Sequence, residues 1–175
     1  MSTDRKFTRF SRTTTPPRID EIPIGGICLS AFVILSQSGE ARHVLMGHLN
    51  KDADWEHIGG LDRTRAATHS IGWMLPSSHL ILYESPHEAA RRILKEQLCL
   101  TDQLLEGPSV FSEVYGANSH WDLEFIFQGQ RDSIDPCDVW KDLSFVDLNK
   151  LKREEIARSH EDILAHVGME VLTDK

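Results

Sequence analysis

Apolar residues run almost without interruption from residue 26 to residue 35, where the sequence reads Gly-Ile-Cys-Leu-Ser-Ala-Phe-Val-Ile-Leu. Both alternating faces of this stretch are apolar, a pattern typical of a strand covered on two sides. A turn signal at residues 37–39 follows, and residues 42–49 then have the composition of a partner strand. The pattern predicts a central strand and its hairpin partner in a layered α/β fold.

A helical period replaces the strand pattern at residues 86–98. Ser85 and Pro86 stand where an N-cap and a first-turn proline are favoured. Glu88, Arg92 and Glu96 are each one turn apart on a polar flank. Apolar residues recur three and four positions apart and form the opposite stripe; they are Ala89, Ala90, Ile93, Leu94 and Leu98.

The second half of the chain predicts another hairpin, at residues 110–116 and 120–128, and a strand at residues 140–146. Along residues 120–128, polar and apolar side chains alternate, so they point to opposite faces of the sheet. The apolar set, which we expect to face the core, is Trp121, Leu123, Phe125 and Phe127. The polar set is His120, Asp122 and Glu124, and an amphipathic helix marked by Ile156, Ile163, Leu164 and Val167 is predicted to end the domain near Gly168.

Two segments lack apolar periodicity. Residues 50–70 are polar and carry Gly59-Gly60, which predicts a long loop or insertion that sets specificity. Residues 1–22 are predicted to be a flexible basic tail ahead of one domain at 23–175. The first eighteen residues carry five basic side chains against one acidic side chain, and we favour a loose tail over a nucleic-acid-binding arm.

Composition narrows the class of protein. The length of 175 residues fits one domain, and the net charge of −8 argues against nucleic-acid binding over the whole surface. No apolar run approaches the roughly 20 residues of a membrane helix, and no secretory signal is recognisable, so we expect a cytoplasmic protein. Cys28, Cys99 and Cys137 have no CxxC spacing and are expected to be reduced thiols; we place Cys28 and Cys99 in the core.

The helix and the residues before it match a known spacing. Nudix hydrolases carry the pattern G-x(5)-E-x(7)-R-E-U-x-E-E-x-G-U, in which U is a bulky apolar residue. In this sequence Ser78, Glu84 and Arg92 occupy the first three fixed positions, and residues 93–100 continue the frame in register. The segment beginning at Glu84, which reads Glu-Ser-Pro-His-Glu-Ala-Ala-Arg-Arg, also resembles the usual start of that helix. The resemblance implies an α/β/α sandwich with a mixed β-sheet over most of residues 25–168.

The sequence departs from the pattern at several of its glycines and metal-binding glutamates. Two serines, Ser77 and Ser78, replace the paired glycines. Ile93 replaces the first glutamate after the arginine, Gln97 replaces the last one, and Cys99 replaces the closing glycine. Among the three helix carboxylates of the family, only Glu96 remains.

The resemblance implies a pyrophosphohydrolase that cleaves a nucleoside diphosphate derivative with Mg²⁺ or Mn²⁺. A divalent cation neutralises the charge that develops on the departing phosphate, and it can be held by one or two carboxylates together with water and substrate phosphates. The residues expected to act in catalysis are Glu84, Arg92 and Glu96, with Glu84 folding back to orient Arg92. The expected metal ligands are Glu96, Gln97 and Glu124, and the expected substrate contacts are Ser77, Ser78, His79 and His120.

Each of these assignments has a plainer alternative. Asp122 and Glu124 could form a solvated strand face, and the histidines could be surface or hydrogen-bonding residues. At the level of function, the runner-up is a Nudix-fold module that binds or regulates through a nucleotide-like ligand without turnover, which Ile93 favours. A structural domain without a ligand is the third reading. A small nucleotide is the expected partner, a membrane is not expected, and a homodimer is left open.

Overall fold

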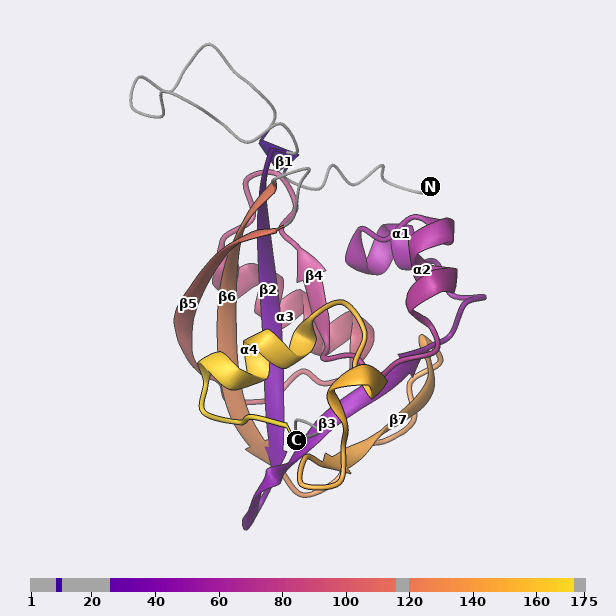
Figure 1. The fold of residues 1–175 in the computed structure, drawn as a ribbon, viewed down its shortest axis with the longest axis vertical. Coiled ribbons are helices and arrows are strands. Elements are labelled where there is room, and N and C mark those ends of the chain that lie inside the picture. Colours follow the sequence, from indigo (N-terminus) through magenta and orange to yellow (C-terminus); the bar gives the residue numbers. More distant parts are fainter. Residues whose placement is uncertain (1–8, 11–25, 116–119, 172–175) are drawn as a thin grey trace.

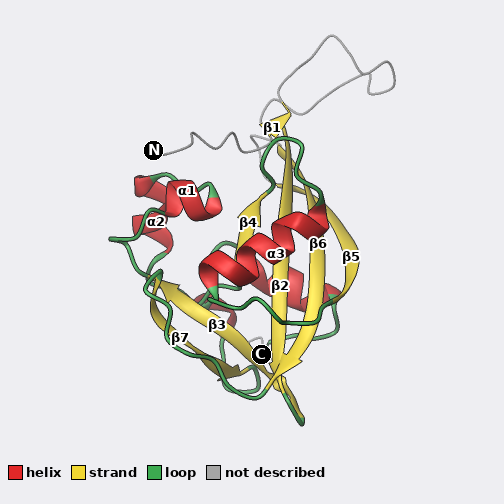
Figure 2. Cartoon of the chain, turned by 180° about the vertical axis from the view of Figure 1, so that it is seen from behind, coloured by secondary structure: helices red, strands yellow, loops and turns green. Residues whose placement is uncertain are grey.

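The computed structural model describes residues 9–10, 26–115 and 120–171. One mixed sheet separates two helices: α4 (His160–His166) covers one face and α3 (Pro86–Gln97) covers the other (Figures 1 and 2). The predicted α/β/α sandwich with a mixed sheet is therefore confirmed.

The sheet is organised around β2 (Ile27–Gln37). Along one edge β2 pairs in parallel with β6 (His120–Arg131), which is followed by β5 (Glu106–Tyr115) at the border of the sheet. Its other edge pairs in turn with β1 (Arg9–Phe10), β4 (Ser77–His79) and the start of β3 (Glu40–Leu49), all antiparallel. Beyond β3 lies β7 (Trp140–Asp147). The insertion of β4 beside β2 brings the predicted substrate residues to the middle of the sheet.

The alternation of β2 explains why both of its faces are apolar. Ala31, Val33 and Leu35 pack into a core beneath α3. Phe32 and Ile34 pack into a second core beneath α4. Each face is thus removed from water by its own helix, as expected for a strand with no polar face.

Helix α3 begins and ends close to its predicted bounds of 86–98. Ser85 accepts a hydrogen bond from the backbone N–H of Glu88, the Glu88 carboxylate accepts one from the backbone N–H of Ser85, and Pro86 starts the first turn. This capping box satisfies backbone donors that a helix start leaves open. The local signals that predicted the helix are those that fix its start.

Residues 50–70 were predicted to be a long loop or insertion, and the prediction of a loop is wrong. Two short helices, α1 (Trp55–Gly59) and α2 (Arg63–His69), occupy this segment. Asp54 and Asp62 cap them through hydrogen bonds to the third residue of each helix. Few apolar side chains hold these helices, so the sequence of this segment shows no helical period. The apolar residues that do hold them pack into a third core; this core contains Trp55, Leu61 and Ala66 together with Leu49, Met74, Cys137 and Trp140.

The expected burial along β6 is also corrected. Phe127 is buried as predicted, but Trp121 and Leu123 are only partly buried, whereas Glu124 on the other face is 6% exposed. The reason is that the segment leading into α4 covers the face that was expected to be polar and open. Cys99, predicted to be a core residue, is exposed instead, while Cys28 and Cys137 are buried.

Within the predicted tail, residues 9–10 form β1 and pair with Cys28 and Ile27 of β2. The rest of residues 1–22 lies outside the described part of the chain, as do residues 116–119 at the turn of the second predicted hairpin. Among the described residues, no helix combines the length and the apolar character needed to cross a membrane.

Candidate functional site

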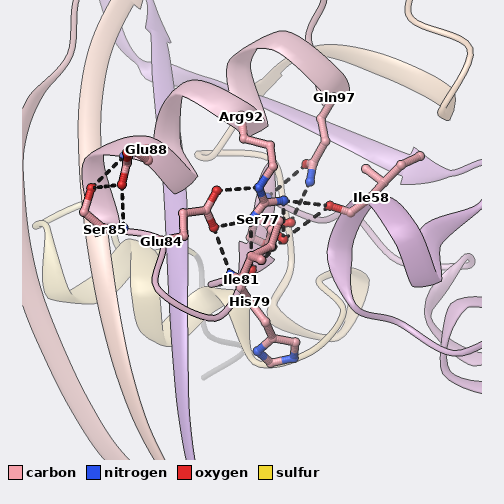
Figure 3. Close-up of polar contacts among 10 residues, drawn as sticks. Ile58, Ser77, His79, Ile81, Glu84, Ser85, Glu88, Arg92 and Gln97 are labelled. Carbon is pink, nitrogen blue, oxygen red and sulfur yellow. Dashed lines mark hydrogen bonds and ion pairs between the residues drawn. The ribbon is translucent and has the colours of Figure 1, made fainter. Parts of the chain in front are cut away.

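A buried ion pair fixes the segment between β4 and α3. The Arg92 guanidinium donates to both carboxylate oxygens of Glu84, with Nε–Oε1 at 2.7 Å and Nη2–Oε2 at 2.8 Å (Figure 3). The two side chains are 10% and 11% exposed, so the pair is only weakly screened by water. The structure therefore places Glu84 against Arg92, as expected for an orienting partner.

The remaining donors of Arg92 hold the surrounding backbone. They contact the carbonyl oxygens of Ile58 at 3.2 Å and His79 at 3.0 Å, and the Ser78 hydroxyl at 3.0 Å. Glu84 in turn accepts a hydrogen bond from the backbone N–H of Ile81 at 2.9 Å. With its donors committed to protein groups, Arg92 acts through the loop it shapes.

Gln97 is fully buried and its amide is bonded to a single residue, Ser77. Its Oε1 accepts from the backbone N–H of Ser77 at 3.1 Å, and its Nε2 donates to the backbone oxygen of Ser77 at 2.8 Å. The backbone oxygen of Gln97 accepts from Trp140 Nε1 at 2.8 Å. Gln97 therefore joins the C-terminal end of α3 to β4 and β7.

A second group of polar side chains lies on the α4 face of the sheet. Glu124 is the register partner of Ser30, and Ser30 is the register partner of His79. The Ser30 hydroxyl lies 3.1 Å from His79 Nδ1, and all three side chains are buried. On the same face of β6, His120 and Asp122 precede Glu124, and His120 Nε2 lies 3.2 Å from Asp122 Oδ2. These two residues form one polar row with Glu124, Ser30 and His79.

Glu124 is the chemically unusual member of this row. Its Oε2 is buried and has no hydrogen-bond partner among the described residues. Burial, and then the negative charge of Asp122, raise the pKa of the Glu124 carboxyl to about 8. At neutral pH this carboxyl is mostly protonated and can donate a hydrogen bond.

Positive charge collects beside this row. Burial and the nearby charge of Arg65 lower the pKa of Arg158 to about 10, and Asp122 and Glu124 act on it in the opposite direction. Burial, and then Arg158 and Arg65, lower the pKa of His69. Backbone hydrogen bonds between Trp73 and residues 155–157 hold the end of α2 against the segment that carries Arg158.

The backbone at this point is strained. Arg158 and Ser159 have φ angles of +61° and +55°, a left-handed conformation that side chains with a Cβ rarely adopt. Two such residues in succession cost free energy that the surrounding structure must offset, and strain of this kind gathers at functional sites. Arg158 and Ser159 thus connect the short 3₁₀ helix at Arg153–Glu155 to the start of α4.

An open groove of about 620 Å³ gives access to the α4 face. It is bordered by Phe111 and Glu113 of β5 and by Ser159, Asp162 and His166 of the α4 segment. Phe111 is the register partner of Glu124, and Glu113 is the partner of Asp122. The groove therefore lies beside the strand that carries Glu124 and Asp122, although neither residue lines it.

No protein-family model matches the sequence, and no curated protein matches it significantly. Similar solved structures were found nevertheless. A mutator MutT protein from Bacillus halodurans superposes with a TM-score of 0.54 at 16% identity, covering 83% of this chain and 86% of that one. The Nudix hydrolase RenU from M. smegmatis gives 0.52 at 17% identity, over 85% and 89%. The dihydroneopterin triphosphate pyrophosphohydrolase of E. coli gives 0.50 at 12% identity, over 69% and 80%.

The chain has the Nudix fold. Identities this low show the fold alone, so the chemistry of the site has to be judged from its own residues.

The residues at the metal-binding positions of the Nudix pattern do not fit a Mg²⁺ or Mn²⁺ cluster. Ile93 is fully buried in the core beneath α3, and Gln97 is committed to Ser77. Glu124 pairs with Ser30 of β2, on the face where Phe32 and Ile34 pack against α4. The helix that carries Glu96 covers the opposite face of the sheet. No group of three or more His, Cys, Asp or Glu side chains in the described ranges is placed to hold a metal ion. Of the expected ligands, α3 itself presents one carboxylate, the partly exposed Glu96.

The structure divides the predicted substrate residues between the two faces. The Ser78 hydroxyl contacts Arg92, whereas the side chain of His79 joins the row with Glu124. His120 lies on the same face of β6 as Glu124. The Ser77 hydroxyl is buried and has no hydrogen-bond partner among the described residues.

Sequence reasoning missed Ser30, Arg65 and Arg158. Ser30 was visible as the one polar residue inside an apolar run, and a polar residue buried in a central strand requires a partner. Arg158 gave no such signal, because its position depends on a strained turn between elements distant from β6 in sequence.

Proposed function

We propose that this Nudix-fold chain binds a nucleoside diphosphate derivative in the groove between β5 and α4, and that it does so without hydrolysis by a metal held on α3. The observation that carries the proposal is the Gln97 amide. Its two hydrogen bonds to Ser77 occupy the side chain at the last carboxylate position of the Nudix pattern. A helix with Ile93 in the core and Gln97 bonded to β4 is built for rigidity rather than for holding cations.

The groove has the chemistry for a ligand with two unlike ends. Beside the groove, Arg158 directly precedes the lining residue Ser159, and the charge of Arg65 acts on Arg158. A diphosphate bound next to this pair would offset their mutual repulsion. Asp122 and Glu113 can accept hydrogen bonds from sugar hydroxyls or from the amino group of a base, and protonated Glu124 can donate one. The similar E. coli protein is a dihydroneopterin triphosphate pyrophosphohydrolase, which supports a phosphate-containing ligand for this chain.

Hydrolysis is the second candidate, because the Glu84–Arg92 geometry is intact. In that case Glu96, assisted by water and substrate phosphates, would be the residue that holds Mg²⁺ or Mn²⁺. The proposed binding function requires nothing of Glu96, so the two candidates differ at this residue.

The test is a panel of nucleoside diphosphate sugars, each titrated calorimetrically with and without Mg²⁺ while product release is followed by chromatography. We expect heat of binding without product in both conditions. Arg65→Gln should weaken binding at least tenfold, whereas Arg63→Gln, an exposed position on the same helix, should leave it unchanged. Glu96→Gln should not affect affinity.

Two results would count against the proposal. Mg²⁺-dependent product formation that disappears in Glu96→Gln would establish the hydrolase instead. Equal affinity of wild type, Arg65→Gln and Arg158→Gln would remove the groove as the binding site.

A further inference from the structure

Two thiols that are distant in sequence meet at the end of α3. The Sγ atoms of Cys99 and Cys137 lie 2.8 Å apart, although 38 positions separate them in the chain. Cys99 directly follows the C-terminal turn of α3 and is exposed, while Cys137 precedes β7 and is buried. One thiol is thus accessible to solutes, and the other lies directly behind it.

The backbone at Cys99 favours a different residue. Its φ is +56°, in the left-handed region. Glycine adopts this region without strain, whereas other residues are disfavoured there by about 1 kcal/mol or more. The Nudix pattern has a glycine at this position, where this chain has Cys99. The buried Cys28, in contrast, lies in a regular strand.

We infer that Cys99 and Cys137 form a reversible disulfide by exchange with a low-molecular-weight disulfide such as oxidised glutathione. The Cys99 thiolate attacks one sulfur of the small disulfide, forms a mixed disulfide and releases one small thiol. The Cys137 thiolate then attacks Cys99 Sγ, breaks the mixed disulfide and releases the second small thiol. Two protein thiols are oxidised and one small disulfide is reduced, so atoms and electrons balance.

The environments of the two sulfurs set the order of these steps. Burial, and then the neighbouring Cys99, raise the pKa of the Cys137 thiol to about 11, so little thiolate forms there at neutral pH. Cys99 is exposed and is the sulfur that a solute can reach. Cys137 therefore acts second, once the mixed disulfide has been delivered to within reach of its sulfur.

The bond would tie together elements that already meet at this corner. Cys137 belongs to the third core with Trp55 and Trp140, and Asn50, at the start of the α1–α2 segment, bonds the backbone at Asp138 and Val139. A disulfide from Cys99 would fasten this assembly to the end of α3. Because it closes a loop of nearly forty residues, it should stabilise the fold against unfolding.

The test uses the full chain, reduced, freed of reductant and incubated with oxidised glutathione. Non-reducing proteolysis and mass spectrometry should recover a peptide in which Cys99 is linked to Cys137. The melting temperature should rise by about 10 °C, and dithiothreitol should reverse the rise. Cys28→Ser is the matched control and should form the same link.

Single variants separate the two steps. Cys137→Ser should accumulate stable glutathione on Cys99, and Cys99→Ser should accumulate neither the adduct nor the link. The inference is overturned if wild type stays unmodified, keeps glutathione on Cys99 without forming the link, or joins Cys99 to Cys28 or to a second chain.

Discussion

Glu124 shows how one side chain can be misjudged from its type. A carboxylate that alternates with aromatic residues on a strand was expected on an open face, yet its 6% exposure makes it part of the interior. It tolerates that position because its protonated form carries no charge to desolvate.

Glu124 should therefore make the stability of the protein depend on pH. Its pKa is raised from 4.5 to about 8 by folding, so between these values the folded state holds a proton that the unfolded state has lost. Stability contributed by this group is present below about pH 4.5 and is lost as the pH rises towards 8, by at most about 5 kcal/mol. In urea unfolding, the free energy of unfolding of Glu124→Gln should rise relative to that of wild type as the pH increases from about 4.5 to 8.

The pH dependence of wild type alone would not isolate Glu124, because His160 also titrates differently in the folded and unfolded states. Burial lowers its pKa well below 6.5, so its effect on stability has the opposite sign and is common to both proteins. A wild-type and Glu124→Gln difference that stays constant from pH 5 to pH 8 would contradict the assignment.

Gln97 and Ile93 show why the Nudix pattern cannot be restored residue by residue. Gln97→Glu replaces a donor to the Ser77 carbonyl by an oxygen, and Ile93→Glu places a charge in the core beneath α3. We expect each change to destabilise the fold by roughly 2–4 kcal/mol, measured by chemical denaturation. Gln130→Glu, at an exposed position of β6, is the control and should have little effect. Variants as stable as wild type would show that the helix accepts carboxylates at these positions.

At the scale of elements, the Glu84–Arg92 pair anchors the loop that leads into α3. Arg92→Lys keeps the charge but cannot reproduce the two-pronged contact with Glu84 or the bonds to Ser78 and His79. We expect a loss of about 3 kcal/mol in the free energy of unfolding. Arg91→Lys, on the exposed side of the same helix, should change stability by less than about 0.5 kcal/mol. Equal losses in the two variants would show that the bonds of Arg92 are not what holds the loop.

The elements that could be predicted are those whose signals are local. Ser85, Pro86 and the apolar stripe lie close together in the sequence and determine α3. The alternation in β6 showed which side chains share a face, but not that the face carrying Glu124 is covered. What could not be predicted depends on distant segments. The burial of Glu124 requires α4 to cover β6, and α1 is held by contacts between Trp55 and Trp140 that are 85 positions apart.

At the scale of the molecule, the sheet separates two kinds of chemistry. The α3 face carries the Glu84–Arg92 pair and a helix anchored in place, while the α4 face carries the buried polar row and the groove. The sequence resemblance identified the first face because its residues are contiguous along the chain. The second face is assembled from β2, β4, β6, α2 and the turn before α4, so no linear motif marks it.

The predicted basic tail, residues 1–22, should contribute little to the stability of the domain. Among residues 1–22 only β1 is described, and its two residues pair with the first two residues of β2. Because β2 is held along its whole length by β6, and further along its other edge by β4 and β3, loss of β1 should remove little of the sheet. A protein beginning at residue 23 should therefore melt within about 3 °C of the full chain, which corresponds to roughly 1 kcal/mol at this size. Leu164→Ala, which creates a cavity beneath α4, is the reference for a loss of core packing. It should lower the melting temperature several times more than removal of residues 1–22 does. If removal of residues 1–22 costs as much as Leu164→Ala, the segment is an integral part of the domain, and its division from residues 23–175 is wrong.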